Sequence, residues 1–180
     1  MVLTFALISL LALVLNGVTG GMSNRLLFSI YRSSWRDPFM YVRLFTHVLG
    51  HASWQHYSGN MLLFLLIGPM LEEKYGSKSL LQLIAITALV TGLVHILLFP
   101  DTGLLGASGI DFAFILLASI TGSRRNGEIP LTLILVAVLY CGQQVYDGLF
   151  TPDNVSQLSH LIGGAVGTVF GLRMPARRRY

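Results

Sequence analysis

Apolar and polar positions follow one another along the chain in long blocks rather than at single residues. Six apolar blocks, bounded by turn residues or charges, are long enough or nearly long enough to cross a bilayer as helices. They cover residues 2–21, 55–71, 79–98, 108–122, 130–149 and 156–174. The pattern therefore predicts an all-α polytopic membrane protein, with six transmembrane helices in a single domain over residues 1–180.

Two of these blocks need a choice between interpretations. The block at 2–21 has features of a signal peptide, but no basic segment precedes it and it is long for a cleaved apolar region. We therefore interpret it as the first span. The block at 108–122 is short for a full crossing, so we expect its beginning to lie below the membrane surface.

The stretch at 22–54 between the first two spans has a different character. Four arginines alternate there with aromatic residues, and Asp37-Pro38 interrupts the middle. The residues concerned are Arg25, Arg32, Arg36 and Arg43 with Tyr31, Trp35, Phe39 and Tyr41. Amphipathic, aromatic segments of this kind lie in the headgroup layer rather than across the bilayer. We expect an interfacial first loop.

Composition supports the membrane assignment and narrows the partners. Hydrophobic residues make up 53% of the chain and charged residues 11%, whereas soluble domains average about 25% charged residues. The mean hydropathy is +0.67. The net charge of +4 does not form a basic stripe interleaved with aromatic residues, so we expect no nucleic-acid partner. The expected partner is the lipid bilayer, and the sequence does not indicate an oligomeric state.

Basic residues assign a direction to the predicted spans. Six spans put both termini on one side, and that side would hold Lys74, Lys78, Arg124, Arg125, Arg173 and Arg177 to Arg179. Because basic residues accumulate on the cytoplasmic side, both termini are predicted to be cytoplasmic. The four arginines of the first loop oppose this rule, and we attribute them to an interfacial position. The compact core favours a bacterial plasma membrane.

Candidate chemistry begins at Leu105-Gly106-Ala107-Ser108-Gly109, where a polar loop meets an apolar block. Ser108 is expected at a helix N-terminus, whose first backbone N–H groups have no partner within the helix and can hold an oxyanion. The flanking Gly106 and Gly109 allow a substrate backbone to come close. An ordinary N-cap or a close helix contact would explain the same residues.

Three further polar residues are predicted at the depth of Ser108. His56 and Asn60 are four residues apart on one face of the second span, and His160 lies one turn into the sixth. Polar groups at membrane depth are costly unless they pair or face water, although they also join helices. We interpret Ser108 as a nucleophile and His160 as its general base, without a third member. His56, Asn60 and the Ser108 N–H would stabilise the oxyanion.

These motifs together resemble those of the rhomboid intramembrane serine proteases, over essentially the whole chain. The resemblance is carried by Gly106 to Gly109 as Gly-x-Ser-Gly, by His56 and Asn60 as His-x-x-x-Asn, and by His160, Gly163 and Gly167 in the last helix. Arg43 ahead of Phe45-Thr46-His47, and Gly68 with Glu72, also match. The resemblance implies a rhomboid-like bundle of six helices, the dyad and oxyanion site above, and transmembrane segments of other proteins as substrates.

Other residues are expected to support this site. Gly163 and Gly167 would let the sixth helix pack closely on the fourth. By resemblance, Phe112 lies under the catalytic histidine. Arg43 and Glu72 would fix loops. His47 and His51 have the spacing of a metal pair, but we favour loop hydrogen bonds and expect neither metal nor cofactor.

One residue departs from the family pattern. Asp111 stands three positions after the serine, where rhomboids usually carry an apolar residue. An acid inside a span must pair or reach water. We expect Asp111 to line a water cavity or to bond His95, Gln143 or Gln144, with a third catalytic role as the less favoured alternative.

Two rival functions remain open at this point. One is a rhomboid-like protein that binds membrane clients without cleaving them, although both Ser108 and His160 are present. The other is a transporter or proton channel that uses His56, His95, Asp111 and His160 as a relay. The chain lacks the repeats and midplane breaks that are common in transporters.

Overall fold

The computed structural model describes residues 1–126, 131, 134, 138 and 154–173. Within these ranges the chain is helical, apart from loops and one isolated antiparallel bridge between Ile30 and Leu104. The elements in order are α1 (Val2–Val18), η1 (Asn24–Phe28), α2 (Pro38–Thr46), η2 (His47–Leu49), α3 (Trp54–Tyr75), α4 (Ser77–Leu98), α5 (Ser108–Asn126) and α7 (Asn154–Arg173).

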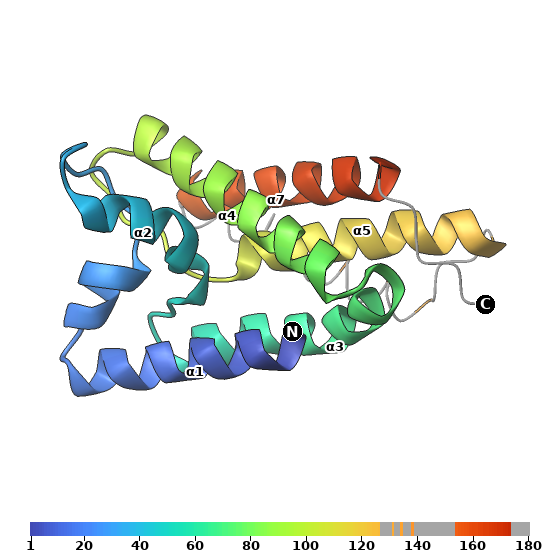
Figure 1. Cartoon of the computed structure of the whole chain (residues 1–180), viewed down its shortest axis with the longest axis horizontal. Helices are drawn as coiled ribbons and strands as arrows, with labels where there is room; N and C mark the ends of the chain where they lie inside the picture. The colour runs from blue at the N-terminus through green and yellow to red at the C-terminus, as the bar shows by residue number, and fades with distance from the viewer. Residues whose placement is uncertain (127–130, 132–133, 135–137, 139–153, 174–180) are drawn as a thin grey trace.

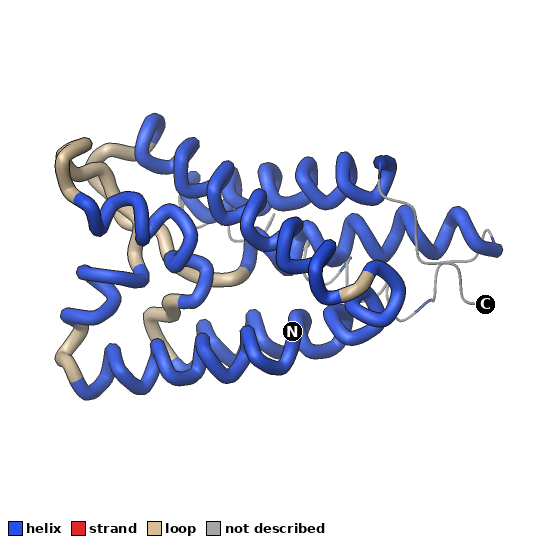
Figure 2. The backbone as a smooth tube through the Cα atoms, in the orientation of Figure 1, coloured by secondary structure: helices blue, strands red, loops and turns tan. Residues whose placement is uncertain are grey.

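The long helices lie alongside one another, and the short elements gather at one end (Figure 1). α3, α5 and α7 begin at this end and run away from it, whereas α1 and α4 run towards it (Figure 1). Most of the described loop segments lie there as well (Figure 2). We call this the loop end of the bundle. Because α3, α5 and α7 all begin there, residues in their first two turns lie near the same end of the bundle.

The helices α1, α3, α4, α5 and α7 overlap the predicted spans, and the predicted fifth span at 130–149 falls mainly outside the described residues. α1 ends at Val18 rather than at residue 21, because Gly20 and Gly21 take positive φ angles of 58° and 91° that interrupt a helix. α3 continues past the predicted end at 71 to Tyr75, with Pro69 inside it.

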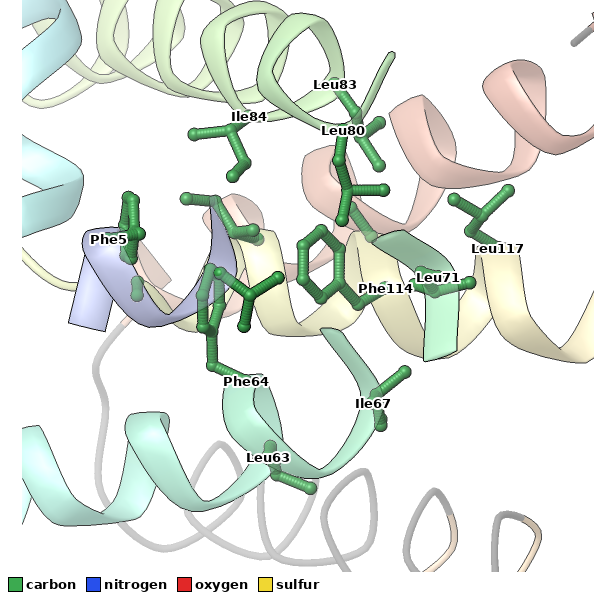
Figure 3. Packing of buried hydrophobic residues seen from close by; sticks show 14 of the residues in the cluster. Phe5, Leu63, Phe64, Ile67, Leu71, Leu80, Leu83, Ile84, Phe114 and Leu117 are labelled. Atoms are coloured by element: carbon green, nitrogen blue, oxygen red, sulfur yellow. The ribbon is translucent and has the colours of Figure 1, made fainter. Parts of the chain in front are cut away.

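Stacked aromatic rings join α1, α3 and α5 in the main hydrophobic core. The rings of Phe5 and Phe64 are stacked with centroids 4.6 Å apart, and those of Phe64 and Phe114 with centroids 5.0 Å apart. Leu80 and Leu83 of α4 are fully buried in the same cluster (Figure 3). This packing fixes α3 and α5 relative to one another, and both carry residues of the candidate site.

The first loop is built around a buried arginine. Arg43 in α2 is only 1% exposed, and its guanidinium donates to Asp37 Oδ2 at 2.7 Å and to Ser33 Oγ at 2.9 Å. It also lies over the Tyr31 ring, 4.3 Å from the centroid. Asp37 caps α2 by accepting from the Phe39 N–H at 3.0 Å. One cation therefore ties the start of α2 to the preceding chain.

The outward side of α2 is apolar. Its exposed residues include Phe39, Tyr41, Val42 and Phe45, while Met40, Arg43 and Leu44 face inward. An exposed face of this composition suits contact with lipid at the headgroup boundary. The position of the first loop in the headgroup layer stays a prediction.

At the opposite end of the bundle, Glu72 joins two elements. Its carboxylate accepts from the Ser77 hydroxyl at 2.6 Å and from the Val2 N–H at 3.0 Å. These bonds tie the turn between α3 and α4 to the start of α1. The contacts are those of a residue that fixes structure, as its position in the sequence suggested.

Candidate active site

Ser108 is the first residue of α5, and the loop before it is fixed by backbone bonds. Ile30 and Leu104 exchange two N–H···O bonds of 2.9 and 2.8 Å. Gly106 donates its N–H to the His47 carbonyl at 3.0 Å and takes a φ of +124°, which residues with a side chain rarely adopt. The loop thus delivers Ser108 to a helix N-terminus, as predicted.

Gly106 also faces the two predicted oxyanion donors. A Cβ atom at this position would lie 2.7 Å from His56 Nε2 and 3.4 Å from Asn60 Nδ2. His56 Nδ1 accepts from the Ala52 N–H at 3.5 Å, which leaves the ring proton on Nε2. Two N–H donors from α3 therefore point at the space that the missing side chain of Gly106 leaves free.

His160 lies on the serine side of the site. Its ring is 5% exposed and stacks on Phe112, with centroids 4.5 Å apart and planes 14° apart. Phe112 is four residues after Ser108 and shares its face of α5. Next to Ser108, Gly109 faces the Ser159 carbonyl, which would be 3.3 Å from an added Cβ. The imidazole thus sits over the helix face that carries the serine.

Close packing of α5 on α7 brings these residues together. A Cβ on Gly163 would overlap the Gly109 carbonyl oxygen, and a Cβ on Gly167 would overlap the Ala113 carbonyl oxygen. Gly164, on another side of α7, would make only an ordinary contact of 3.7 Å with Leu116. Gly163 and Gly167 therefore set the separation of the two helices, in the seam that the sequence predicted.

The structure adds His51 to the site, a residue that sequence reasoning did not connect to it. Its Nε2 accepts from Asn60 Nδ2 at 3.1 Å, and its Nδ1 faces the Leu49 carbonyl at 3.2 Å. The ring meets that of His56 edge-on at 5.0 Å. The sequence shows only that His51 precedes His56 by five residues. Because His51 lies in a loop, this spacing does not predict the direction in which its side chain points.

His47 and His51 both contact protein groups through their ring nitrogens, in line with the loop hydrogen bonds that the sequence analysis favoured. His47 Nδ1 donates to the Arg43 carbonyl at 3.0 Å and its Nε2 faces Thr91 Oγ1 at 3.3 Å. Burial lowers the pKa of His47 to about 4, so its ring is neutral at pH 7. The described residues hold no group of three or more His, Cys, Asp or Glu that could bind a metal ion.

Asp111 is fully buried, and the bond to His95, one of the alternatives expected for it, is not formed. Within the described part of the chain neither of its carboxyl oxygens has a hydrogen-bond partner. His95 instead uses Nε2 with the Thr102 carbonyl at 3.0 Å, because the loop after α4 folds back over it. The alternative partners Gln143 and Gln144 lie outside the described residues.

Comparison with known proteins identifies the family. The family model for the rhomboid domain matches residues 38–177 of the chain. The chain belongs to the rhomboid family. It is also 30% identical over 139 residues to rhomboid-related protein 1 of Caenorhabditis elegans, an alignment that covers 72% of this chain and 38% of that protein. The chain therefore spans about two fifths of the length of this curated relative.

Membership in the rhomboid family makes this a membrane protein, of a family that includes intramembrane serine proteases. Among the described helices, α4 is the one with both the length and the hydropathy of a full membrane span. α1 and the first part of α5 are apolar but shorter. The depth of Ser108 relative to the membrane surface stays a prediction.

Proposed function

We propose that this rhomboid is an intramembrane serine endopeptidase that hydrolyses peptide bonds in or near the transmembrane segments of other membrane proteins. Ser108 is the nucleophile and His160 the general base. His56, Asn60 and the Ser108 backbone N–H stabilise the oxyanion. Neither a metal nor a cofactor takes part in this mechanism.

The observation that carries the proposal is that the short segment from Gly106 to Phe112 contacts both groups of predicted site residues. Gly106 faces two side-chain donors of α3, and the ring of Phe112 stacks on the imidazole of His160 from α7. Ser108 lies between these two residues at the start of α5. Acyl transfer needs a nucleophile, a base beside it and donors beside the carbonyl oxygen, and these groups come from three separate helices.

The reaction follows from these roles. Ser108 Oγ attacks the carbonyl carbon of the scissile bond while His160 takes the hydroxyl proton. The carbonyl oxygen becomes an oxyanion that receives N–H bonds above Gly106. His160 then gives its proton to the leaving amine, and the C–N bond breaks to leave an acyl ester on Ser108. Water then attacks the ester carbonyl while His160 takes its proton; the bond from carbon to Ser108 Oγ breaks, His160 returns the proton to Oγ, and the carboxylic acid product leaves.

The bilayer sets the substrate class. The site lies in the first two turns of α3, α5 and α7 at the loop end, where the apolar side of α2 suits the headgroup boundary. We infer a six-helix bundle with both termini in the cytoplasm and the site open to the outside. A transmembrane segment whose helix unwinds near that surface would present its backbone to Ser108.

Serine-directed labelling tests the proposal. The full-length protein, purified in detergent, should be labelled covalently by a fluorophosphonate probe and should cleave at least one member of a panel of single-span proteins in liposomes. Ser108→Ala should abolish both, because the nucleophile is lost, and His160→Ala should reduce both by at least a thousandfold.

Failure of this experiment would take a recognisable form. A wild-type protein that the probe does not label, while Ser108→Ala binds the same membrane clients equally well, would favour a client-binding protein without protease activity. The control for folding is that wild type and Ser108→Ala unfold at the same temperature.

A further inference from the structure

His51 touches the oxyanion side of the site without a role in the reaction as proposed. It is 0% exposed and lies in the turn between η2 and α3. Asn24 of η1 donates through Nδ2 to the His51 carbonyl at 3.0 Å, which fixes the backbone there. Burial of an imidazole lowers the stability of the fold unless both of its ring nitrogens have hydrogen-bond partners.

The two contacts of the His51 ring determine its tautomer. Nδ1 faces the Leu49 carbonyl at 3.2 Å, and a carbonyl oxygen can only accept. Nδ1 therefore carries the proton, and Nε2 can only accept. The atom of Asn60 that faces Nε2 at 3.1 Å must then be the amide nitrogen.

This assignment matters because Asn60 Nδ2 also faces Gly106. The nitrogen lies 3.4 Å from the Cβ position at Gly106, beside the space into which His56 Nε2 points. An amide rotated by 180° would present an oxygen there and repel an oxyanion. With one N–H bound to His51, the other N–H of the same nitrogen is available to a substrate oxygen.

His51 contributes to the second donor as well. Its ring meets the His56 ring edge-on, with centroids 5.0 Å apart and planes 71° apart. The residue after it, Ala52, donates its N–H to His56 Nδ1 at 3.5 Å. One buried residue and its neighbour thus touch both side chains of the candidate oxyanion site.

We propose that His51 is a positioning residue, which holds the amide of Asn60 with its nitrogen towards the reacting carbonyl oxygen. This inference rests on the proposed function and adds to it a fixed direction for one donor. Burial lowers the pKa of His51 to about 4, so Nε2 stays unprotonated, and able to accept, at neutral pH.

A double-mutant cycle between His51 and Asn60 tests the proposal. His51→Phe keeps a flat ring but has no acceptor, whereas His51→Gln carries an amide oxygen close to the position of Nε2. Each is measured in full-length protein, alone and together with Asn60→Ala. Cleavage of a single-span protein gives kcat and KM for the first cycle. The Tm values from thermal unfolding in detergent give a second, independent double-mutant cycle, on stability.

We expect His51→Phe to lower kcat at least tenfold with KM within twofold of wild type, because only the transition state uses the donor. His51→Gln should recover at least a third of the wild-type kcat. In the Asn60→Ala background, His51→Phe should change kcat by less than twofold, since the group that it orients is gone. The Tm effects of the two substitutions should likewise be less than additive.

Other outcomes separate this inference from the function on which it rests. Additive effects on kcat in a cleaving protein, or equal losses for His51→Gln and His51→Phe, would overturn the positioning role and leave the protease intact. A wild-type protein that neither cleaves nor is labelled at Ser108 overturns both, and additive Tm effects would then also exclude the His51–Asn60 contact itself.

Discussion

The two sides of the candidate site are held by different kinds of interaction. On the α3 side, directional hydrogen bonds from the first loop hold Asn60 and His56. On the α5–α7 side, His160 is held by ring stacking on Phe112 and by the close contact between the two helices, which Gly163 permits because it has no side chain. The first side depends on polar bonds that fix rotation, and the second on backbone packing that fixes distance.

The difference follows from what each side has to do. An oxyanion donor works only if its N–H points at the developing charge, so the rotation of an amide or imidazole must be fixed. A nucleophile and its base need above all a short separation between two helices. In a bilayer, where lipid and apolar side chains compete equally for a helix surface, small residues give that close approach. Substitutions should therefore act on the two sides through different measurable quantities.

The largest effect is expected in the packed side. Gly163→Ala places a Cβ on the Gly109 carbonyl oxygen, a backbone atom that cannot move without shifting α5. It should lower the free energy of unfolding by about 3 kcal/mol, the upper end for overpacking, and lower kcat more than tenfold. Thermal unfolding and cleavage by the same detergent-purified sample are the measurements.

Gly164→Ala is the matched control, since it makes the same change one residue along α7. The added Cβ would lie 3.7 Å from Leu116, an ordinary contact, and alanine favours a helix by up to about 1 kcal/mol. Stability and kcat should stay at or slightly above wild type. Equal losses from the two substitutions would mean that the seam does not set the separation.

Much of this packing was predictable from sequence alone. A hydrophobic block with a glycine every four residues predicts both a span and its contact face, and Gly163 and Gly167 occupy that seam. The start of α5 at Ser108 was predictable too, because Pro100 and Gly103 mark the loop before it. These features depend on local pattern, which a sequence displays directly.

Less of the α3 side could be predicted from the sequence. The bond from Asn60 to His51 depends on how the turn before α3 folds, and Asn24, far earlier in the chain, helps to hold that turn. The bond from Asp111 to His95, one of the alternatives that the sequence offered, is not formed, and the Thr102 carbonyl of the loop after α4 contacts the imidazole. Spacing places residues at one depth but does not orient loop side chains.

Acidification should have a smaller effect, which acts through His47 in the first loop. Burial lowers the pKa of His47 to about 4 from an ordinary value of 6.5, in the first loop and outside the spans. The unfolded chain therefore binds more protons than the folded one between these values, and stability falls as the pH falls. From pH 7 to pH 5, His47 should cost about 2 kcal/mol of the free energy of unfolding.

His47→Gln removes this titration, so its stability should change with pH by about 2 kcal/mol less than wild type over the same range. Unfolding in detergent at pH 7, 6 and 5 makes the comparison, with Gly164→Ala as a variant that keeps every histidine. A wild-type curve that is flat, or one that His47→Gln leaves just as steep, would show that His47 is not held neutral by burial.

The smallest effect is expected within the α5–α7 side, at the ring contact between Phe112 and His160. Phe112→Leu keeps an apolar side chain under His160 but removes a stacked pair, whose interaction is worth about 1 kcal/mol beyond the area buried. The imidazole should then sample more orientations, lowering kcat about fivefold with KM unchanged, while Tm falls by only a few degrees. Phe112→Tyr keeps the ring and should keep at least half of the wild-type kcat. If leucine and tyrosine behaved alike, stacking would not orient the base, and the glycine seam alone would account for the position of His160.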